Sequence, residues 1–450
     1  MRLLATLIGA GALAMPVAAQ APSLTIYNDG RVLVRRSIPA RVPRGPSTHR
    51  IEVGALDLAT VFSRDSLVTI TAASYDGATD MQSVIRRSIG RRITFRYGGV
   101  KDTVSAKVLA VDPERYEMPD GTVTFSMPGT PQFPRDLVVV DPVLSLSVES
   151  RRAREGLDLG YFTSGGTWQA SYQVILGAKA ARVQGSAVVA VDRLSVEGAS
   201  VQLLAGSVGR AAQMRDETRF RRNVAAVAEM TVAGVAAIEE RVGEFHLYTL
   251  PGTLNLAPGI ETSRALFEPA TTGYERRYVV RGFLPYRGPL VQTGEEPQSP
   301  VEVRYRIERK SGSEFGDTPL PGGVIRLYQP DEGGRLQLVG EANVDHTPAG
   351  RDVTVSAGLA FDITAKRVQT SYATVRQGRY TVATADYEVT LANATDQAVT
   401  VDVLEERFGE WSILESSVPA EKVSSTVTRF RVTVPAKGEA TLTYQVRARW

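Results

Sequence analysis

The chain has 450 residues, of which 43% are hydrophobic and 22% are charged, so it has enough apolar material for folded cores, and disorder along its whole length is excluded. Its 52 basic residues nearly balance its 49 acidic ones, which argues against a nucleic-acid-binding protein, and its length favours about three domains. The chain has no cysteine, which excludes disulfides, thiolate metal sites, a cysteine nucleophile and lipid attachment through an N-terminal cysteine.

The first residues have the organisation of a secretory signal peptide. Arg2 supplies a positive charge, an apolar run follows over 3–15, and small residues occupy 17–19. This order predicts a signal peptide at 1–19 that is cleaved after Ala19, and it is more typical of export than of a buried N-terminal helix. No later run reaches about 18 apolar residues, so no transmembrane helix is expected in the mature chain. An exported chain without disulfides fits the bacterial periplasm or cell surface.

The segment 20–155 is predicted to be an N-terminal β domain. Two runs that alternate between apolar and polar residues, 23–28 and 31–38, flank Asp29-Gly30. Asp-Gly between two such runs is a strong signal for a β-hairpin.

A helix and a compact group of strands interrupt this domain. The helix is predicted over 80–89, with Asp80 as its N-cap and Gly90 at its end. Short strands within 91–128 are typical of a small SH3-like barrel, inserted near the N-terminus. The proline-rich stretch 128–136 then predicts a linker.

The central domain, 156–375, contains the densest strand pattern. Apolar residues alternate in three successive runs, 168–176, 183–191 and 201–206, separated by turns that contain glycine or aspartate. We predict that these runs form one sheet of a β-sandwich. The alternation places Trp168 on the core face, which favours packing over a role in stacking on a ligand.

The Ala-rich segment 211–243 interrupts the strand pattern, and we interpret it as a partly ordered insertion rather than a surface helix. The last domain, 376–450, consists of strands and turns with the size and alternation of an immunoglobulin-like sandwich. Within it, Asn393 begins a glycosylation acceptor pattern, but a hairpin turn before Val399 is the favoured interpretation. The expected fold class is therefore mainly β, with several antiparallel β-sandwiches.

Few residues follow a pattern typical of catalysis or metal binding. The nucleophile elbow, the nucleotide-binding glycine motifs and the metalloprotease helix motif are all missing from the sequence. Its three histidines, His49, His246 and His346, are far apart, so no metal site is predicted. Asp345 and His346 are the natural starting pair for a Ser-His-Asp arrangement and are the candidate catalytic residues, although turn chemistry is the commoner role for such a pair.

Acidic pairs are interpreted as solvated turns or faces. Adjacent carboxylates on a strand point to opposite faces and are poor partners for acid-base catalysis. The stretches around Asp76 and Asp80 and around Asp331 and Glu332 lack the spacing of a calcium-binding loop. The pairs are Glu295-Glu296, Glu405-Glu406, Asp76 with Asp80, and Asp331 with Glu332.

Several short motifs occur in order between Leu157 and Trp450. They are Tyr161-Phe162, Ser164-Gly165-Gly166, Trp168-x-Ala170-x-Tyr172, Leu203-Leu204-Ala205-Gly206, Tyr248-Thr249-Leu250-Pro251, His346-Thr347-Pro348 followed by Gly350, and Pro435-Ala436-x-Gly438-Glu439-Ala440 with Thr443-Tyr444. Through them the chain resembles a bacterial domain family of unknown function shared with mucoidy inhibitor A-like proteins. The long coiled coil of those proteins is missing here, and 211–243 also diverges. The resemblance implies an exported, β-rich protein and supplies neither an activity nor catalytic residues.

These observations predict a non-catalytic, exported binding or scaffold protein of the cell envelope, with an envelope protein or polymer as its partner. Exposed sheet edges would offer binding by strand addition. The alternative hypothesis is a hydrolase that acts on an envelope polymer or peptide through Asp345 and His346. No cofactor, metal or nucleic acid is expected, and the pattern favours no particular oligomeric state.

Overall fold

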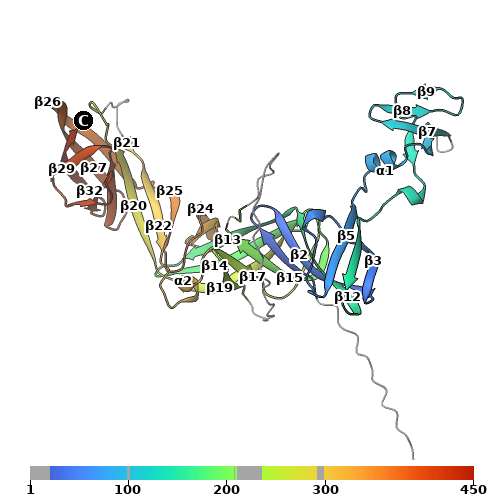
Figure 1. Cartoon of the computed structure of the whole chain (residues 1–450). Coiled ribbons are helices and arrows are strands. Elements are labelled where there is room, and N and C mark those ends of the chain that lie inside the picture. Colours follow the sequence, from blue (N-terminus) through green and yellow to red (C-terminus); the bar gives the residue numbers. More distant parts are fainter. Residues whose placement is uncertain (1–20, 99–101, 207, 210–235, 291–297) are drawn as a thin grey trace, which may run out of the picture. The chain divides into compact units, whose positions relative to one another are not determined.

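The computed structural model describes residues 21–98, 102–206, 208–209, 236–290 and 298–450 (Figure 1). It is mainly β, with 63% strand and 4% helix arranged in several largely antiparallel sheets, which confirms the predicted fold class at this level. Among the described residues, the helices are too short or too polar for any of them to cross a membrane.

Three sequence predictions concern residues outside this description. The signal peptide at 1–19, with its cleavage site, lies outside the described residues, as does Glu295-Glu296. Most of the Ala-rich segment 211–243 lies outside them too. Its end is described, and there Ile238–Val242 forms the strand β16 at the edge of a sheet.

The chain divides into two compact units. The first comprises Met1–Trp168, Val189–Gly234 and Glu240–Thr262, and the second comprises Gln169–Val188, Val235–Glu239 and Ser263–Trp450. The division falls within the strands β13 (Gly166–Leu176) and β14 (Ala181–Val191) rather than at the predicted boundaries near 155 and 375.

The first unit contains an eight-stranded sheet. Its strands in order are β16, β17 (Phe245–Thr249), β15 (Val196–Ala205), β1 (Ser23–Tyr27), β2 (Arg31–Val42), β12 (Arg154–Ser164) and β4 (Phe62–Ser63), and β18 (Leu254–Leu256) also pairs with β15. β1 and β2 form the predicted hairpin, and Gly30 in its turn has a φ of +88°, which glycine adopts without a steric penalty. β1 also runs parallel to β15, with Leu24 paired to Val201. β1 therefore lies beside a strand that follows it by about 170 residues in the chain.

The motif Ser164-Gly165-Gly166 forms the corner between β12 and β13. Gly165 has a φ of +89°, and its N–H donates to the Gly30 carbonyl at 2.9 Å. A Cβ atom on Gly166 would lie 2.2 Å from Cγ2 of Val32, so the close approach requires glycine. This part of the motif therefore has a structural role.

A three-stranded sheet in the same unit carries the predicted helix and the strands that follow it. The sheet contains β3 (Gly45–Glu52), β11 (Val143–Ser150) and β5 (Val68–Asp76), with the 3-10 turn η1 (Leu58–Thr60) between β3 and β5 in the chain. Between β5 and β11 the chain forms α1 (Met81–Arg87) and a five-stranded antiparallel sheet. That sheet has the order β10 (Thr130–Gln132), β6 (Arg92–Arg96), β7 (Thr103–Val111), β8 (Glu114–Glu117) and β9 (Val123–Thr124).

The helix α1 follows the prediction closely, but the linker does not. The Asp80 side chain accepts from the Ser83 N–H at 3.0 Å, which is the predicted N-cap. Val84 and Ile85 belong to the same buried cluster as the residues of the five-stranded sheet. The linker prediction is wrong, because β10 lies within 128–136 and the 3-10 turn η2 (Arg135–Leu137) begins there. An edge strand tolerates Pro131, since proline lacks only the N–H that a central strand would need.

The second unit contains a five-stranded sheet in which β14 and β13 are central. Its order is β19 (Thr262–Thr272), β14, β13, β23 (Gly323–Pro330) and β24 (Leu336–Val344), with β13 and β23 parallel. The predicted faces of β13 are confirmed, because Ala170, Tyr172 and Val174 are buried and Trp168 is half-buried. The prediction that the three runs form one sheet is wrong, because β15 belongs to the eight-stranded sheet. Alternation determines which face of a strand is buried but not which strand lies beside it.

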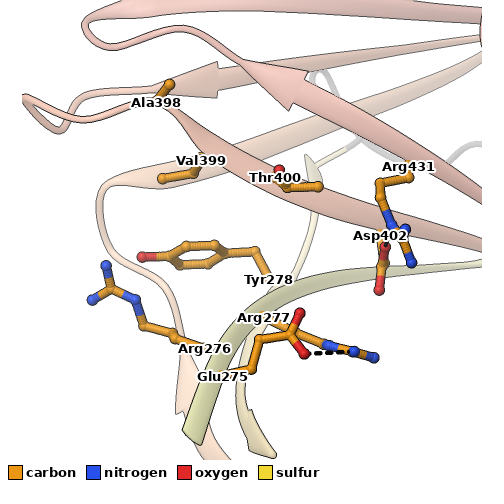
Figure 2. A pocket seen from close by; sticks show the side chains of 9 residues that line it. All are labelled: Glu275, Arg276, Arg277, Tyr278, Ala398, Val399, Thr400, Asp402 and Arg431. Atoms are coloured by element: carbon orange, nitrogen blue, oxygen red, sulfur yellow. Dashed lines mark hydrogen bonds and ion pairs between the residues drawn. The ribbon is translucent and has the colours of Figure 1, made fainter. Parts of the chain in front are cut away.

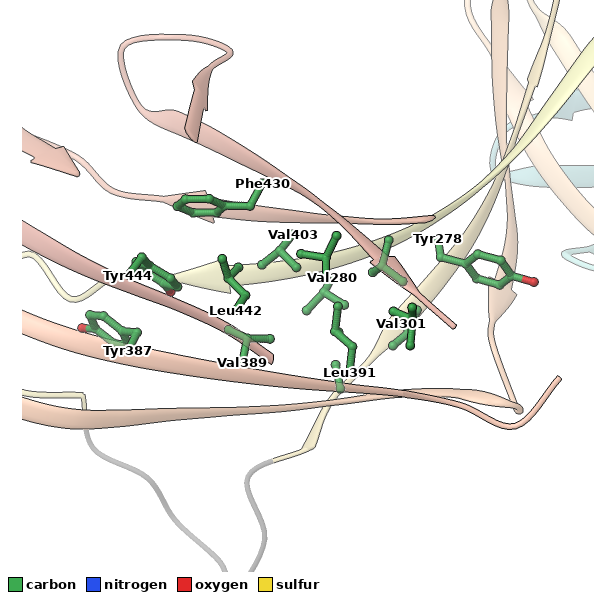
Figure 3. Packing of buried hydrophobic residues seen from close by; sticks show 14 of the residues in the cluster. Tyr278, Val280, Val301, Tyr387, Val389, Leu391, Val403, Phe430, Leu442 and Tyr444 are labelled. Carbon is green, nitrogen blue, oxygen red and sulfur yellow. The ribbon is translucent and has the colours of Figure 1, made fainter. Parts of the chain in front are cut away.

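Two facing sheets form a sandwich at the end of the second unit (Figure 3). One has the order β25 (Val353–Leu359), β22 (Val301–Ile307), β20 (Tyr274–Phe283), β28 (Val399–Glu406), β31 (Val427–Val434) and β30 (Ala420–Lys422). The other has the order β21 (Gln298–Ser299), β26 (Ile363–Gln377), β27 (Tyr380–Asn393), β32 (Gly438–Arg449) and β29 (Glu410–Ser416). Val280 and Val301 contribute to the same core as Leu442, so this sandwich starts well before the predicted boundary at 376.

Candidate functional site

The two candidate catalytic residues lie in an exposed loop after β24. The Nδ1 atom of His346 accepts from the Gly322 N–H at 3.0 Å, and the hydroxyl of Thr347 donates to the Asp345 carbonyl at 2.7 Å. In a Ser-His-Asp triad, the Nδ1–H of the histidine donates a hydrogen bond to the carboxylate. Here Nδ1 is an acceptor, so the geometry fits a loop that is fixed by hydrogen bonds rather than a catalytic pair.

A buried arginine holds the residues that follow this loop. Arg309 is 2% exposed, and its Nη1 donates to the carbonyls of Pro348 at 2.8 Å and Arg351 at 3.2 Å. Its Nε donates at 3.0 Å to the carbonyl of Phe315, which belongs to the short helix α2 (Glu314–Asp317). The loop that carries His346 therefore continues into a segment anchored to the protein interior.

Aspartates at the turns act as caps and ion-pair partners. Asp76 forms an ion pair with Arg87 of α1. Asp331 accepts from the backbone N–H groups of Gly333 at 3.0 Å and Arg335 at 2.9 Å. Among the described residues, no three acidic or histidine side chains gather into a metal site.

Asn393 lies where the sequence predicted a hairpin turn. It is 3% exposed, and its Nδ2 donates to the carbonyls of Gln397 at 2.8 Å and Pro435 at 2.9 Å. β27 ends at Asn393 and β28 begins at Val399, so the side chain ties the turn to the loop before β32. These hydrogen bonds give Asn393 a structural role in the turn, as the sequence predicted.

The sandwich core contains an ion pair that sequence patterns did not reveal. Glu405 is fully buried on the inner face of β28, whereas Glu406 is half-buried on the other face, as predicted for adjacent residues. Arg367 of β26 binds Glu405 through two hydrogen bonds of 2.8 and 3.0 Å, and its guanidinium lies 4.6 Å from the Tyr387 ring centroid. Burial alone lowers the pKa of Arg367, but the negative charge of Glu405, together with Tyr444 and the hydrogen bonds to both, outweighs burial, and the pKa is raised. A pair of this kind joins the two sheets and is closed to solvent.

A charged groove lies on the six-stranded sheet of the sandwich (Figure 2). Its volume is about 390 Å³, within the usual range of about 300–1,000 Å³ for ligand sites. It is lined by residues of β20, β28, the loop before β28, and β31. These residues are Glu275, Arg276, Arg277, Tyr278, Ala398, Val399, Thr400, Asp402 and Arg431.

The groove exists because two parallel strands diverge. The paired register of β20 and β28 begins at Tyr278 with Val401. Before these residues, 275–277 of β20 and 398–400 on the β28 side flank the groove without pairing to each other. The strands are separated by more than 100 residues in the chain, so sequence periodicity carries no signal for this gap.

Carboxylates and guanidiniums alternate along the groove. The Nη2 atom of Arg277 donates to Glu275 at 2.6 Å, and Arg306 of β22 lies 3.6 Å from the same carboxylate. The hydrogen bond from Arg277 holds the pKa of Glu275 below its usual range. Nε of Arg431 lies 3.5 Å from Asp402, a long contact for a charge-assisted bond. Glu275 is therefore ionised at neutral pH, and both carboxylates already have guanidinium partners.

Three guanidiniums face these two carboxylates in the lining, so positive charge is in excess. The Arg276 guanidinium lies 5.5 Å from the Tyr278 ring centroid and hydrogen-bonds with the Tyr305 side chain of β22, but it forms no described ion pair. The Nε–H of Arg277 is buried and has no acceptor within the described part of the chain. The Arg431 side chain is 57% exposed and has only the long contact with Asp402 among its described ion pairs. The groove thus retains capacity to donate hydrogen bonds to an anion.

Comparisons with protein families and with curated proteins identify no related protein. No protein-family profile matches the chain, and a search of curated proteins finds no match. The chemistry of the described residues is therefore the basis on which a function is proposed.

Proposed function

We propose that the protein is a non-catalytic binding or scaffold protein of the cell envelope, and that it holds a partner at the charged groove between β20 and β28. One observation carries the proposal: the groove has excess guanidinium charge, because Arg276 contacts two tyrosines rather than a described carboxylate and Arg431 has only a long contact with Asp402. These side chains project from strands of a packed sandwich, and a rigid framework favours recognition because little order has to be gained on binding.

The proposal includes export and family membership. The charge, apolar run and small residues of 1–19 support cleavage after Ala19 and a location in the periplasm or at the cell surface. The ordered motifs from Leu157 onward support kinship with the domain family shared with mucoidy inhibitor A-like proteins. The same proposal assigns an immunoglobulin-like topology to the last sandwich, from its two facing sheets, and an SH3-like one to the five short strands after α1.

Site-specific photo-crosslinking in cells tests the binding role. A photoreactive amino acid replaces Thr400, which lines the groove, or Thr364, an exposed residue of β26 in the opposite sheet that serves as the control. We expect one reproducible partner band from position 400 and none from position 364. Equal crosslinking from both positions, or none from either, would contradict a partner at the groove.

The hydrolase alternative is tested in the same strain. His346→Ala removes only an acceptor for the Gly322 N–H, so the crosslink at position 400 and any envelope phenotype should persist. Loss of the phenotype in this variant, with the protein still folded and exported, would favour the hydrolase hypothesis instead.

A further inference from the structure

The backbone on both sides of the groove has an open edge. Residues 275–277 pair with β22 on one side, and Val399 and Thr400 pair with β31 on one side. Their other edges face the gap, because the pairing of β20 with β28 starts only at Tyr278 and Val401. An extended peptide binds such edges through main-chain hydrogen bonds, as in other cases of strand addition.

The charges around the gap fit acidic side chains. The guanidiniums just outside the groove have protein partners: Arg429 donates to Glu421 at 2.6 Å, and Arg306 donates to Asp352 at 2.8 Å. By contrast, Arg276 and Arg431 line the groove itself: Arg276 contacts Tyr278 and Tyr305 but forms no described ion pair, and Arg431 has only the 3.5 Å contact with Asp402. In Figure 2 they lie toward opposite ends of the groove, so an elongated ligand would meet one cation at each end.

The lining favours a peptide over an acidic carbohydrate. Tyr278, the aromatic residue of the lining, is only 8% exposed and offers little ring surface for a sugar to stack on. Most of the other lining residues are charged or carry a hydroxyl group. Open backbone edges beside such residues match the main chain and side chains of a peptide.

We infer that the groove binds an extended, acidic peptide segment of a partner protein. One carboxylate meets Arg276, a second meets Arg431, and the peptide main chain occupies the gap between β20 and β28. The inference rests on the proposed binding role, and it specifies the partner as a protein with acidic residues in an extended stretch. Salt should weaken the complex, because exposed charge pairs are screened.

Peptide titrations of the full mature chain test the inference. The probe is a blocked, fluorescently labelled hexapeptide of glutamates, whose carboxylates point to both faces of an extended chain, and binding is followed by fluorescence anisotropy. The controls are the same peptide with glutamine in place of glutamate, a hexamer of a uronic acid, and inorganic phosphate. We expect the acidic peptide to bind at least tenfold more tightly than any control.

Single substitutions then assign the contacts. Arg276→Gln and Arg431→Gln should each weaken binding about fivefold, which is the scale of a partly exposed charge-assisted contact. Arg281→Gln is the matched control, since it lies exposed on the same strand outside the lining and should change little. Glu275→Gln should tighten binding about threefold, because it frees Arg277 and removes a competing carboxylate.

The contrary results are equally specific. Tighter binding of the uronic acid hexamer, equal binding of the glutamine peptide, or no measurable peptide binding would each overturn the inference. An equal loss with Arg281→Gln would overturn the assignment to the groove. If circular dichroism shows that Arg431→Gln does not fold, the binding measured with Arg276→Gln still tests the assignment to the groove. A partner that crosslinks at position 400 without peptide binding would leave the binding role intact and remove only the acidic-peptide inference.

Discussion

At the scale of single residues, the ion pair between Arg367 and Glu405 is the most consequential contact in the sandwich. It lies between the two sheets, with Arg367 6% exposed and Glu405 fully buried. Gly282 on the neighbouring strand leaves room for it, because a Cβ there would lie 2.4 Å from the Glu405 carboxylate. Bringing two charges out of water is costly, and only mutual contact with good geometry offsets that cost. Each partner is therefore indispensable while the other remains.

Glu405→Gln should destabilise the sandwich by about 3–5 kcal/mol, because it leaves the Arg367 charge buried without a counter-ion. Urea unfolding followed by circular dichroism measures the change. Replacing both residues, as Arg367→Met with Glu405→Gln, should recover much of the loss, since no unpaired charge remains. If the double variant is less stable than Glu405→Gln alone, the two charges are not coupled as described.

At the scale of elements, the sequence predicted which faces of strands are buried better than it predicted their neighbours. The hairpin at Asp29-Gly30, the helix cap at Asp80 and the buried face around Tyr172 depend on contacts within a few residues, and periodicity reports them. Parallel pairs such as β13 with β23 and β20 with β28 join segments more than 100 residues apart. The alternation of apolar and polar residues within a strand carries no information about such pairing.

The candidate site was missed for the same reason. The sequence shows the charged residues 275–277 of β20 but no pattern that marks them as a site, because the groove forms only where β20 and β28 stop pairing. The buried arginines Arg309 and Arg367 were also missed, because the groups that neutralise or accept from them lie on other elements. In contrast, Asp345 and His346 were chosen as candidates because they are adjacent in the sequence. Adjacency does not determine which ring nitrogen of His346 carries the proton or which group it hydrogen-bonds.

The parallel pair of β13 and β23 depends on a glycine at its start. A Cβ atom on Gly323 would lie 2.1 Å from the Ala170 carbonyl oxygen, so Gly323→Ala should shift the strands apart and cost about 1–3 kcal/mol. The matched control is Gly333→Ala in the turn after β23, where the nearest atom is 3.4 Å away and the effect should stay below about 0.5 kcal/mol. Thermal melting compares the two variants, and similar losses would show that the close approach is not what constrains position 323.

At the scale of the whole molecule, the chain consists of two compact units with separate hydrophobic clusters. The clusters around Leu144 and around Phe95 belong to the first unit, and the cluster around Val401 belongs to the second. Because burial of apolar surface is the main source of stability, each unit has its own driving force for folding. The split within β13 and β14 works against this independence, since these strands have residues in both units.

We expect the separate clusters to dominate, so that urea unfolds the mature chain in two transitions. The three tryptophans allow the units to be observed one at a time, because Trp168 belongs to the first unit and Trp411 and Trp450 belong to the second. Trp168→Phe leaves fluorescence that reports the second unit, and the pair Trp411→Phe with Trp450→Phe leaves fluorescence that reports the first. Adding Glu405→Gln to each background should lower the midpoint of the second unit and leave that of the first in place, because the buried ion pair lies between the two sheets of the sandwich in the second unit. Coincident midpoints that shift together would instead mean that β13 and β14 couple the two units into one cooperative structure.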